Sequence, residues 1–215
     1  DIIESKDPLK DIVKFVEVDK LETIGFDNQV SFAYYQALQA IFEGYTLSPQ
    51  TNFMEELRMI KDEKELATIR KACSISDRAF TDVLDFIKPG QTTELQVANF
   101  LDFRMREYGA SGISFESIIA SGYRSAMPHG VASDKVIQSG ETLTMDFGCY
   151  YNHYVSDMTR TIHIGETTDE EREIYDIVLR SNRSLIDATK AGMTRRDYDK
   201  VARDVIVEAG YGDYF

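Results

Sequence analysis

Two aspartates near the middle of the chain carry the strongest signal for chemistry. Asp146 lies in segment 141–147, where apolar and polar residues alternate, and Asp157 belongs to a second alternating segment, 156–163. Alternation with a period of two is typical of strands that bury one face. Two such strands joined by a short connection form a hairpin. The pattern therefore predicts a β-hairpin with one carboxylate on each strand.

The register of this hairpin depends on its turn. We expect a two-residue turn at Tyr151-Asn152, because asparagine adopts left-handed backbone conformations at low cost. Counting outward from that turn, Asp146 faces Asp157, and Cβ atoms of facing residues lie about 5 Å apart. The predicted register thus places two carboxylates side by side.

Neighbouring carboxylates repel each other unless a shared proton, a basic side chain or a cation compensates. Here the same side of the ribbon carries threonines, whose hydroxyls can hydrogen-bond carboxylates that bind a metal. Thr159 and Thr161 share a face with Asp157 and are predicted to give this support. We therefore favour a divalent cation. Two solvated aspartates on an exposed hairpin remain the alternative.

A third candidate is His129, which stands between a proline and a glycine in a predicted loop. A loop of this kind presents a side chain rather than packing it into a core. Because the loop precedes the strand of Asp146, His129 is a candidate catalytic residue, with an ordinary loop histidine as the alternative. No role is assigned to His153 or His163.

The flanking segments predict the elements that hold these residues. Helices are expected over residues 52–88 and after threonine caps at Thr92 or Thr93, at Thr168 and at Thr194, with a strand over 115–120. The order helix, helix, strand, hairpin, helix, helix is α+β with antiparallel strands, and not a βαβ winding. Residues 1–45 are typical of part of a small α/β unit.

The composition is that of an ordinary globular protein, with 43% hydrophobic and 28% charged residues. The 37 acidic against 24 basic residues give a net charge of −13, which argues against a partner made of nucleic acid or anionic membrane. No apolar run approaches transmembrane length, and no secretory signal pattern begins the chain. Two cysteines without metal-type spacing favour a reduced, cytoplasmic protein.

Three motifs carry a resemblance to a known family. They are Pro128-His-Gly, the segment SGETLTMDFG at 139–148 and the segment SDMTRT at 156–161. Together they resemble the pita-bread (creatinase/aminopeptidase) metallopeptidases, and within these the Xaa-Pro dipeptidases (prolidases) and Xaa-Pro aminopeptidases. The resemblance implies two domains: residues 1–48 as the last part of an amino-terminal α/β domain, and residues 49–215 as the amino-terminal part of a pita-bread catalytic domain.

The resemblance also implies a function. A dinuclear metallopeptidase with two divalent ions, manganese or cobalt, would hydrolyse Xaa-Pro bonds in a proline-containing peptide. Asp146 and Asp157 match two metal ligands, with Asp157 bridging both ions, and His129 matches a histidine near the substrate amide. The family's remaining histidine and two glutamates follow a helix like residues 194–209. The chain is therefore expected to be truncated at both ends, and the fragment to be inactive and not necessarily metal-bound.

Other functions stay open within the same fold. A noncatalytic pita-bread protein that binds partners and a metal-free creatinase-like hydrolase are the alternatives, and a methionine aminopeptidase fits the motifs less well. Asp146, Asp157 and His129 argue against the noncatalytic protein, and the aspartate pair argues against the metal-free hydrolase. The upstream α/β segment and the segment SDMTRT argue against the methionine aminopeptidase. From the family, the assembly is expected to be a homodimer.

Overall fold

The chain folds into two units, Asp1–Lys64 and Glu65–Phe215. A computed structural model describes residues 4–18 and 20–215. The sequence predicts a boundary at residues 48/49, whereas the structure groups residues 49–64 with the first unit. Within the described part of the chain, no helix combines the length and the apolar character needed to cross a membrane.

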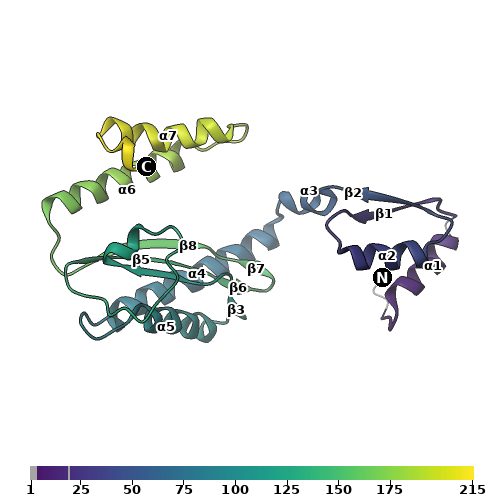
Figure 1. Cartoon of the computed structure of the whole chain (residues 1–215), viewed down its shortest axis with the longest axis horizontal. Coiled ribbons are helices and arrows are strands. Elements are labelled where there is room, and N and C mark those ends of the chain that lie inside the picture. Colours follow the sequence, from purple (N-terminus) through teal and green to yellow (C-terminus); the bar gives the residue numbers. More distant parts are fainter. Residues whose placement is uncertain (1–3, 19) are drawn as a thin grey trace. The chain divides into compact units, whose positions relative to one another are not determined.

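The first unit is a small α/β unit, as predicted. Strand β1 (Thr23–Asp27), helix α2 (Phe32–Ile41) and strand β2 (Thr46–Gln50) form a parallel βαβ arrangement, and α1 (Pro8–Val18) lies beside α2 (Figure 1). Strand β2 was not predicted, because Pro49 is typical of a connection. A two-stranded sheet consists only of edges, where proline is tolerated.

The helix predicted over residues 52–88 is wrong in one respect, because it is two helices, α3 (Phe53–Met59) and α4 (Glu63–Phe86). The chain is extended at Ile60 (φ −96°, ψ 118°). Asp62 then accepts a hydrogen bond from the backbone N–H of Lys64 at 2.8 Å. An aspartate in this position provides the local start signal for the second helix.

The second unit contains the predicted order of helices and antiparallel strands. Its further elements are α5 (Glu94–Glu107), β3 (Gly112–Ile113), β4 (Ile118–Ser121), η1 (Gly122–Ala126), β5 (Glu141–Phe147), β6 (Cys149–Tyr151), β7 (Tyr154–Val155), β8 (Met158–Ile164), α6 (Asp169–Ala188), α7 (Arg195–Glu208) and η2 (Gly212–Tyr214). The caps at Thr93, Thr168 and Thr194 are confirmed, since each side chain accepts a hydrogen bond from the first turn of its helix.

The core of this unit lies between helices α4 and α5 and one face of the sheet β4-β5-β8 (Figure 1). Leu143, Met145 and Phe147 of β5 are fully buried in that core. Because successive side chains of a strand point to opposite faces, Asp146 must point away from it. The apolar alternation therefore determines on which side of the sheet the carboxylate lies.

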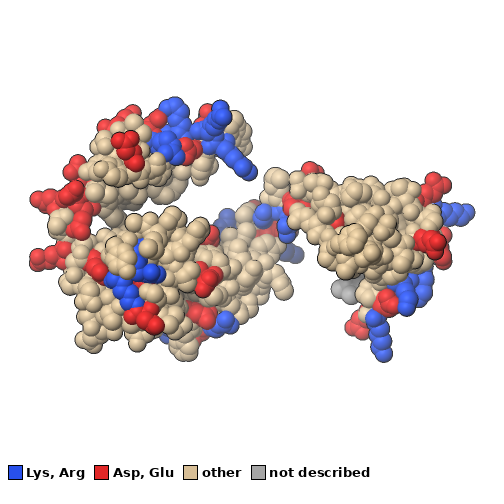
Figure 2. All heavy atoms as spheres, viewed as in Figure 1, with Lys and Arg blue, Asp and Glu red and all other residues tan. Residues whose placement is uncertain are grey.

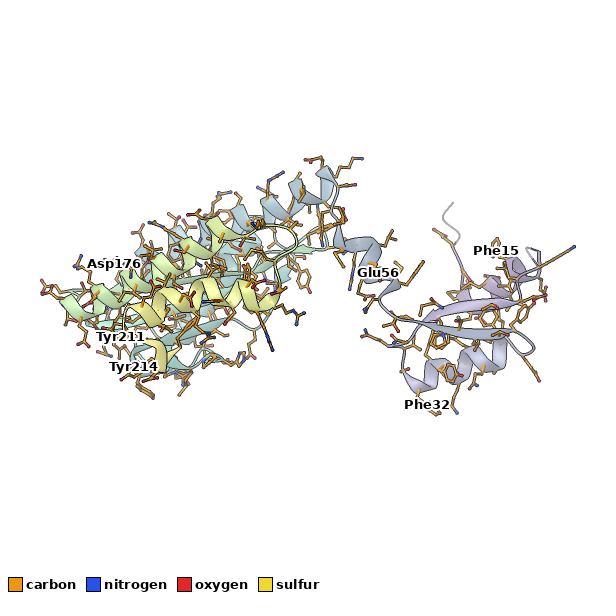
Figure 3. All side chains as sticks on the ribbon, turned by 90° about the horizontal axis from the view of Figure 1, so that it is seen from above. Phe15, Phe32, Glu56, Asp176, Tyr211 and Tyr214 are labelled. Atoms are coloured by element: carbon orange, nitrogen blue, oxygen red, sulfur yellow. The ribbon has the colours of Figure 1, made fainter. Side chains whose placement is uncertain are left out.

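Helices α6 and α7 pack against each other and are joined by a hydrogen bond from Ser181 Oγ to the carbonyl of Ala202 at 2.8 Å. Tyr211 and Tyr214 follow α7 (Figure 3). Together with Ile174 of α6 they line an apolar hollow. Basic side chains gather over α7 on the face that Figure 2 shows. Part of this charge is neutralised within the helix by i,i+4 pairs with aspartates.

Candidate metal site

The predicted register of the hairpin is wrong by two residues. The turn is Asn152-His153, with φ of 46° and 69°, and it is closed by the pairing of Tyr151 with Tyr154. Positive φ at both central residues is the conformation of a type I′ turn, whose twist fits a hairpin. Asp146 consequently faces Thr159 rather than Asp157.

A shift of two residues keeps every side chain on its predicted face, because the side-chain period of a strand is two. Asp157 therefore stays near Asp146 although it no longer lies opposite. It occupies the break between β7 and β8, where the regular ladder stops. The charge of Asp157, and a hydrogen-bonding contact with it, both act on Asp146. The structure thus brings the two predicted aspartates together by a different route.

Ser156 determines where Asp157 is presented. Its side chain is 2% exposed, and its hydroxyl accepts a hydrogen bond from the backbone N–H of Cys149 at 3.0 Å and bonds to the Ser76 hydroxyl at 2.7 Å. Its backbone N–H donates to the Cys149 carbonyl at 3.0 Å. Its carbonyl accepts from the Ser114 hydroxyl at 2.9 Å. All polar groups of Ser156 are therefore engaged immediately before Asp157.

Gly148 makes this approach possible. A Cβ atom at this position would lie 2.0 Å from the carbonyl oxygen of Ser156 and 2.5 Å from the Ser114 hydroxyl. Only glycine leaves room for two backbones this close. Sequence reasoning missed both roles. The available signals were a glycine directly after a strand and a small polar residue directly before an acidic one.

The carboxylate of Asp146 is incompletely satisfied. Its Oδ1 atom is buried, and it has no hydrogen-bond partner among the described residues. Burial raises the pKa of Asp146, and the charge of Asp157 raises it further, while a hydrogen bond from Thr159 opposes the shift. A buried polar atom without a partner costs free energy. Asp146 is therefore held in a state that a bound cation would relieve.

The donor set fits a hard divalent cation in part. Two adjacent carboxylates offer the oxygen ligands that such ions accept. Thr159 supports Asp146 as expected, whereas the Thr161 hydroxyl bonds to Thr144 at 3.3 Å instead. The described residues contain no group of three or more histidine, cysteine or acidic side chains placed to hold a metal. Among the described residues, the two neighbouring carboxylates are therefore the candidate ligands.

His129 is exposed at a turn in which the N–H of Gly130 donates to the Met127 carbonyl at 3.2 Å. Two residues later, Val131 forms a bridge with Ile118 of β4. Ile118 pairs on its other side with Asp146. The histidine therefore belongs to the segment beside β4, one strand away from the strand of Asp146. Its contribution to the site stays a prediction.

Comparison with known proteins gives two family matches. Residues 67–215 match metallopeptidase family M24, and residues 1–60 match the creatinase/prolidase N-terminal domain. The Xaa-Pro dipeptidase of Pyrococcus furiosus is 40% identical over 216 aligned residues, which cover 99% of this chain and 62% of that protein. These matches cover both units of the fold.

Solved structures of related proteins support the same family. An Xaa-Pro dipeptidase from Bacillus anthracis has a TM-score of 0.90 and 41% identity, over 98% of this chain and 59% of that one. An X-Pro aminopeptidase from Thermotoga maritima has a TM-score of 0.91 and 38% identity, over 98% and 60%. The chain thus spans about 60% of the length of these relatives. The predicted resemblance and the pita-bread fold are confirmed, and the chain belongs to metallopeptidase family M24.

Proposed function

We propose that this chain carries part of the active site of a metal-dependent peptidase that hydrolyses Xaa-Pro bonds. The observation that carries the proposal is the buried, unpartnered oxygen of Asp146 beside a second carboxylate, Asp157. The names of the relatives, Xaa-Pro dipeptidase and X-Pro aminopeptidase, support the substrate class. A proline-containing peptide is accordingly the proposed substrate.

Asp146 and Asp157 would be the residues of this chain that hold the two divalent ions. When bound, such ions supply Lewis-acid activation of water and of the substrate carbonyl. Asp146 must lose its proton before it can serve as a ligand, and the hydrogen bond from Thr159 favours its ionised form. The family resemblance is the support for manganese or cobalt, since oxygen ligands accept several divalent ions and do not select one by themselves.

His129 would act on the substrate. An exposed imidazole can donate a hydrogen bond from one ring nitrogen and accept one at the other. Placed near the scissile amide, it would stabilise the negative charge that develops on the carbonyl oxygen, or pass a proton to the leaving nitrogen. The support for this role is the match of Pro128-His-Gly to the family motif.

We further propose that ligands outside this chain complete the site, so that the 215 residues alone hydrolyse little or no substrate. The support is that the described residues offer only a pair of ligands. Both cysteines are free, which agrees with a cytoplasmic location. A homodimer is the proposed assembly, and light scattering of the purified protein measures it directly.

The deciding experiment compares D146A with D134A in a polypeptide extended to the length of the relatives. Asp134 is an exposed carboxylate on a nearby loop and serves as the matched control. We expect D146A to lose bound Mn²⁺ and at least about 10³-fold in kcat/KM for an Xaa-Pro dipeptide, because Lewis-acid catalysis contributes several kcal/mol. D134A should keep both. Full metal content and turnover in D146A would contradict the proposal.

The same measurements separate the alternatives. A noncatalytic relative would bind metal or partners without turnover of any Xaa-Pro peptide. A metal-free hydrolase would keep its activity after treatment with a chelator. The proposed enzyme loses activity on chelation and regains it when Mn²⁺ or Co²⁺ is restored.

A further inference from the structure

A second carboxylate in this unit is buried more completely than Asp146, and the proposed function does not use it. Glu94 is the first residue of α5, and its side chain is 0% exposed. A buried carboxylate is costly unless hydrogen bonds and an opposite charge satisfy it. The identity of its partners therefore shows what Glu94 holds in place.

Five donors satisfy the Glu94 carboxylate. Its Oε1 accepts from the backbone N–H of Ser121 at 2.7 Å and from the Ser121 hydroxyl at 2.9 Å. Its Oε2 accepts from Arg124 Nε at 3.0 Å, and from the backbone N–H and the hydroxyl of Ser133 at 3.2 and 2.6 Å. The donors come from two stretches of chain, one before residue 125 and one after residue 132.

The segment between these two stretches carries His129. We call residues 122–132 the histidine loop. Arg124 closes it internally, since Nη2 donates to the Val131 carbonyl at 2.6 Å. The bridge from Val131 to Ile118 then ties its far end to the strand next to β5. One carboxylate thus binds both ends of a loop whose tip is exposed.

The backbone at the start of α5 repeats the contact. The N–H groups of Glu94 and Leu95 donate to the carbonyls of Lys135 and Ser133 at 3.0 and 2.9 Å. The first N–H groups of a helix have no partners within the helix, so the residues that follow the histidine loop supply the acceptors. Lys135 also donates from Nζ to the Ser121 hydroxyl at 2.8 Å, which links the two ends of the loop a second time.

From this geometry we propose that Glu94 is the positioning residue for His129, a role that rests on the proposed function of that histidine. Glu94 does not touch substrate. It sets the distance between the two ends of the histidine loop, and thereby the place of the imidazole relative to Asp146.

A displacement of about 1 Å at a reacting centre can cost about 10²-fold in rate. A buried ion pair is a weak source of net stability compared with apolar packing. The buried charge of Glu94 is therefore explained better by the geometry that it fixes than by the net stability that it adds.

The first test measures hydrogen exchange by mass spectrometry on the 215-residue chain. E94Q removes the charge, and E107Q at the exposed end of the same helix is the matched control. We expect amides of residues 122–132 to exchange at least about tenfold faster in E94Q, while α4, β5 and β8 keep their protection. E107Q should match the wild type. Unchanged protection of the loop in a folded E94Q protein would overturn the proposal.

A milder variant covers the case in which E94Q does not fold. S133A removes one hydroxyl donor to Glu94, and S133T keeps it. We expect S133A to loosen the histidine loop selectively and S133T to restore its protection. Equal exchange of the histidine loop in S133A and wild type would contradict the proposal that Glu94 holds the two ends of this loop.

The second test asks whether Glu94 acts through His129, in the metal-loaded polypeptide of the relatives' length. We expect E94Q to lower kcat about 10- to 100-fold with an unchanged Kd for Mn²⁺. In a background of H129A, E94Q should cost little more. Additive losses, or an unchanged kcat in E94Q, would overturn the positioning role. If H129A alone leaves kcat unchanged, the proposed catalytic role of His129 fails. Hydrogen exchange then tests only whether Glu94 holds the two ends of the histidine loop together.

Discussion

Two carboxylates of the second unit, Glu94 and Asp146, have opposite surroundings. Glu94 is fully buried, pairs with Arg124 and accepts hydrogen bonds at both oxygens. Asp146 is half-buried, lies beside another acid, Asp157, and its Oδ1 has no hydrogen-bond partner within the described part of the chain. A satisfied carboxylate fixes the positions of the groups that donate to it. An unsatisfied one costs stability, and such sites are typical of positions that bind a ligand.

The surroundings of the two regions explain the difference. Around Glu94 the chain supplies donors from three residues and the N-terminal end of a helix, which favours a negative charge. Around Asp146 the surrounding strands supply one hydroxyl, from Thr159, and a second negative charge. The first region is electrostatically complete. The second has an excess of acceptors, which is the arrangement that a cation completes.

The largest expected effect contrasts the two carboxylates directly. E94A should lower the free energy of unfolding of the metal-free chain by about 3–5 kcal/mol, because Arg124 loses its buried partner. D146N should leave that free energy unchanged or raise it, because it removes a charge that lies near the charge of Asp157. Urea unfolding of both variants measures the contrast. Similar losses in both would remove the distinction between them.

The next effect concerns the backbone that presents Asp157. G148A should destabilise the chain by about 1–3 kcal/mol, because the added Cβ would meet the Ser156 carbonyl at 2.0 Å. It should also weaken Mn²⁺ binding by moving Asp157. G112A is the matched control, since a Cβ there meets only the end of the Arg106 side chain at 3.4 Å. Equal behaviour of the two variants would contradict the close approach.

A smaller effect is expected from the hydroxyl beside Asp146. T159V removes the hydrogen bond that lowers the pKa of Asp146, so that pKa should rise further and Mn²⁺ affinity should fall about 10-fold or more. T161V is the control, because the Thr161 hydroxyl bonds to Thr144 instead. Titration with Mn²⁺ followed by electron paramagnetic resonance compares the two. A loss of Mn²⁺ affinity confined to T161V would contradict the assignment of Thr159 as the hydroxyl that supports Asp146.

The smallest effect is the pH dependence of metal-free stability. Folding raises the pKa of Asp146 above its ordinary 3.8, first through burial and then through Asp157. The stabilising contribution of its protonated form is complete below pH 3.8 and is lost as the pH rises through the raised value. We expect the free energy of unfolding of D146N to rise relative to that of the wild type across that pH window. Above the window, the difference between the two proteins should be constant. Urea unfolding at several pH values follows the change, and a difference independent of pH would contradict it.

Much of the architecture is predictable from local signals. Threonine caps at Thr93, Thr168 and Thr194 mark three helix starts correctly, because capping depends on residues within one turn. The break between α3 and α4 was missed. Its signal, the aspartate at Asp62, lies within a run of charges that also suits an uninterrupted helix.

The candidate site also has features that local sequence determines and features that depend on the folded structure. Residue order alone determines that Asp146 and Asp157 share a face away from the core, because strand alternation with buried Leu143 and Phe147 leaves no other choice. Tertiary structure decided the register. Tyr151-Asn152 and Asn152-His153 both offer an asparagine to the turn, and the greater tendency of histidine than tyrosine toward positive φ is a local preference, not a requirement.

Tertiary structure alone also decided which carboxylate has hydrogen-bond donors for both of its oxygens. At the sequence level, Glu94 is an ordinary acid in the first turn of a helix, since its donors come from residues 27 to 39 positions away. The burial of Asp146 Oδ1, away from any hydrogen-bond donor of the described residues, is equally a property of the packed sheet. Hydrogen-bond satisfaction depends on partners distant in sequence, and those partners meet only when the chain has folded.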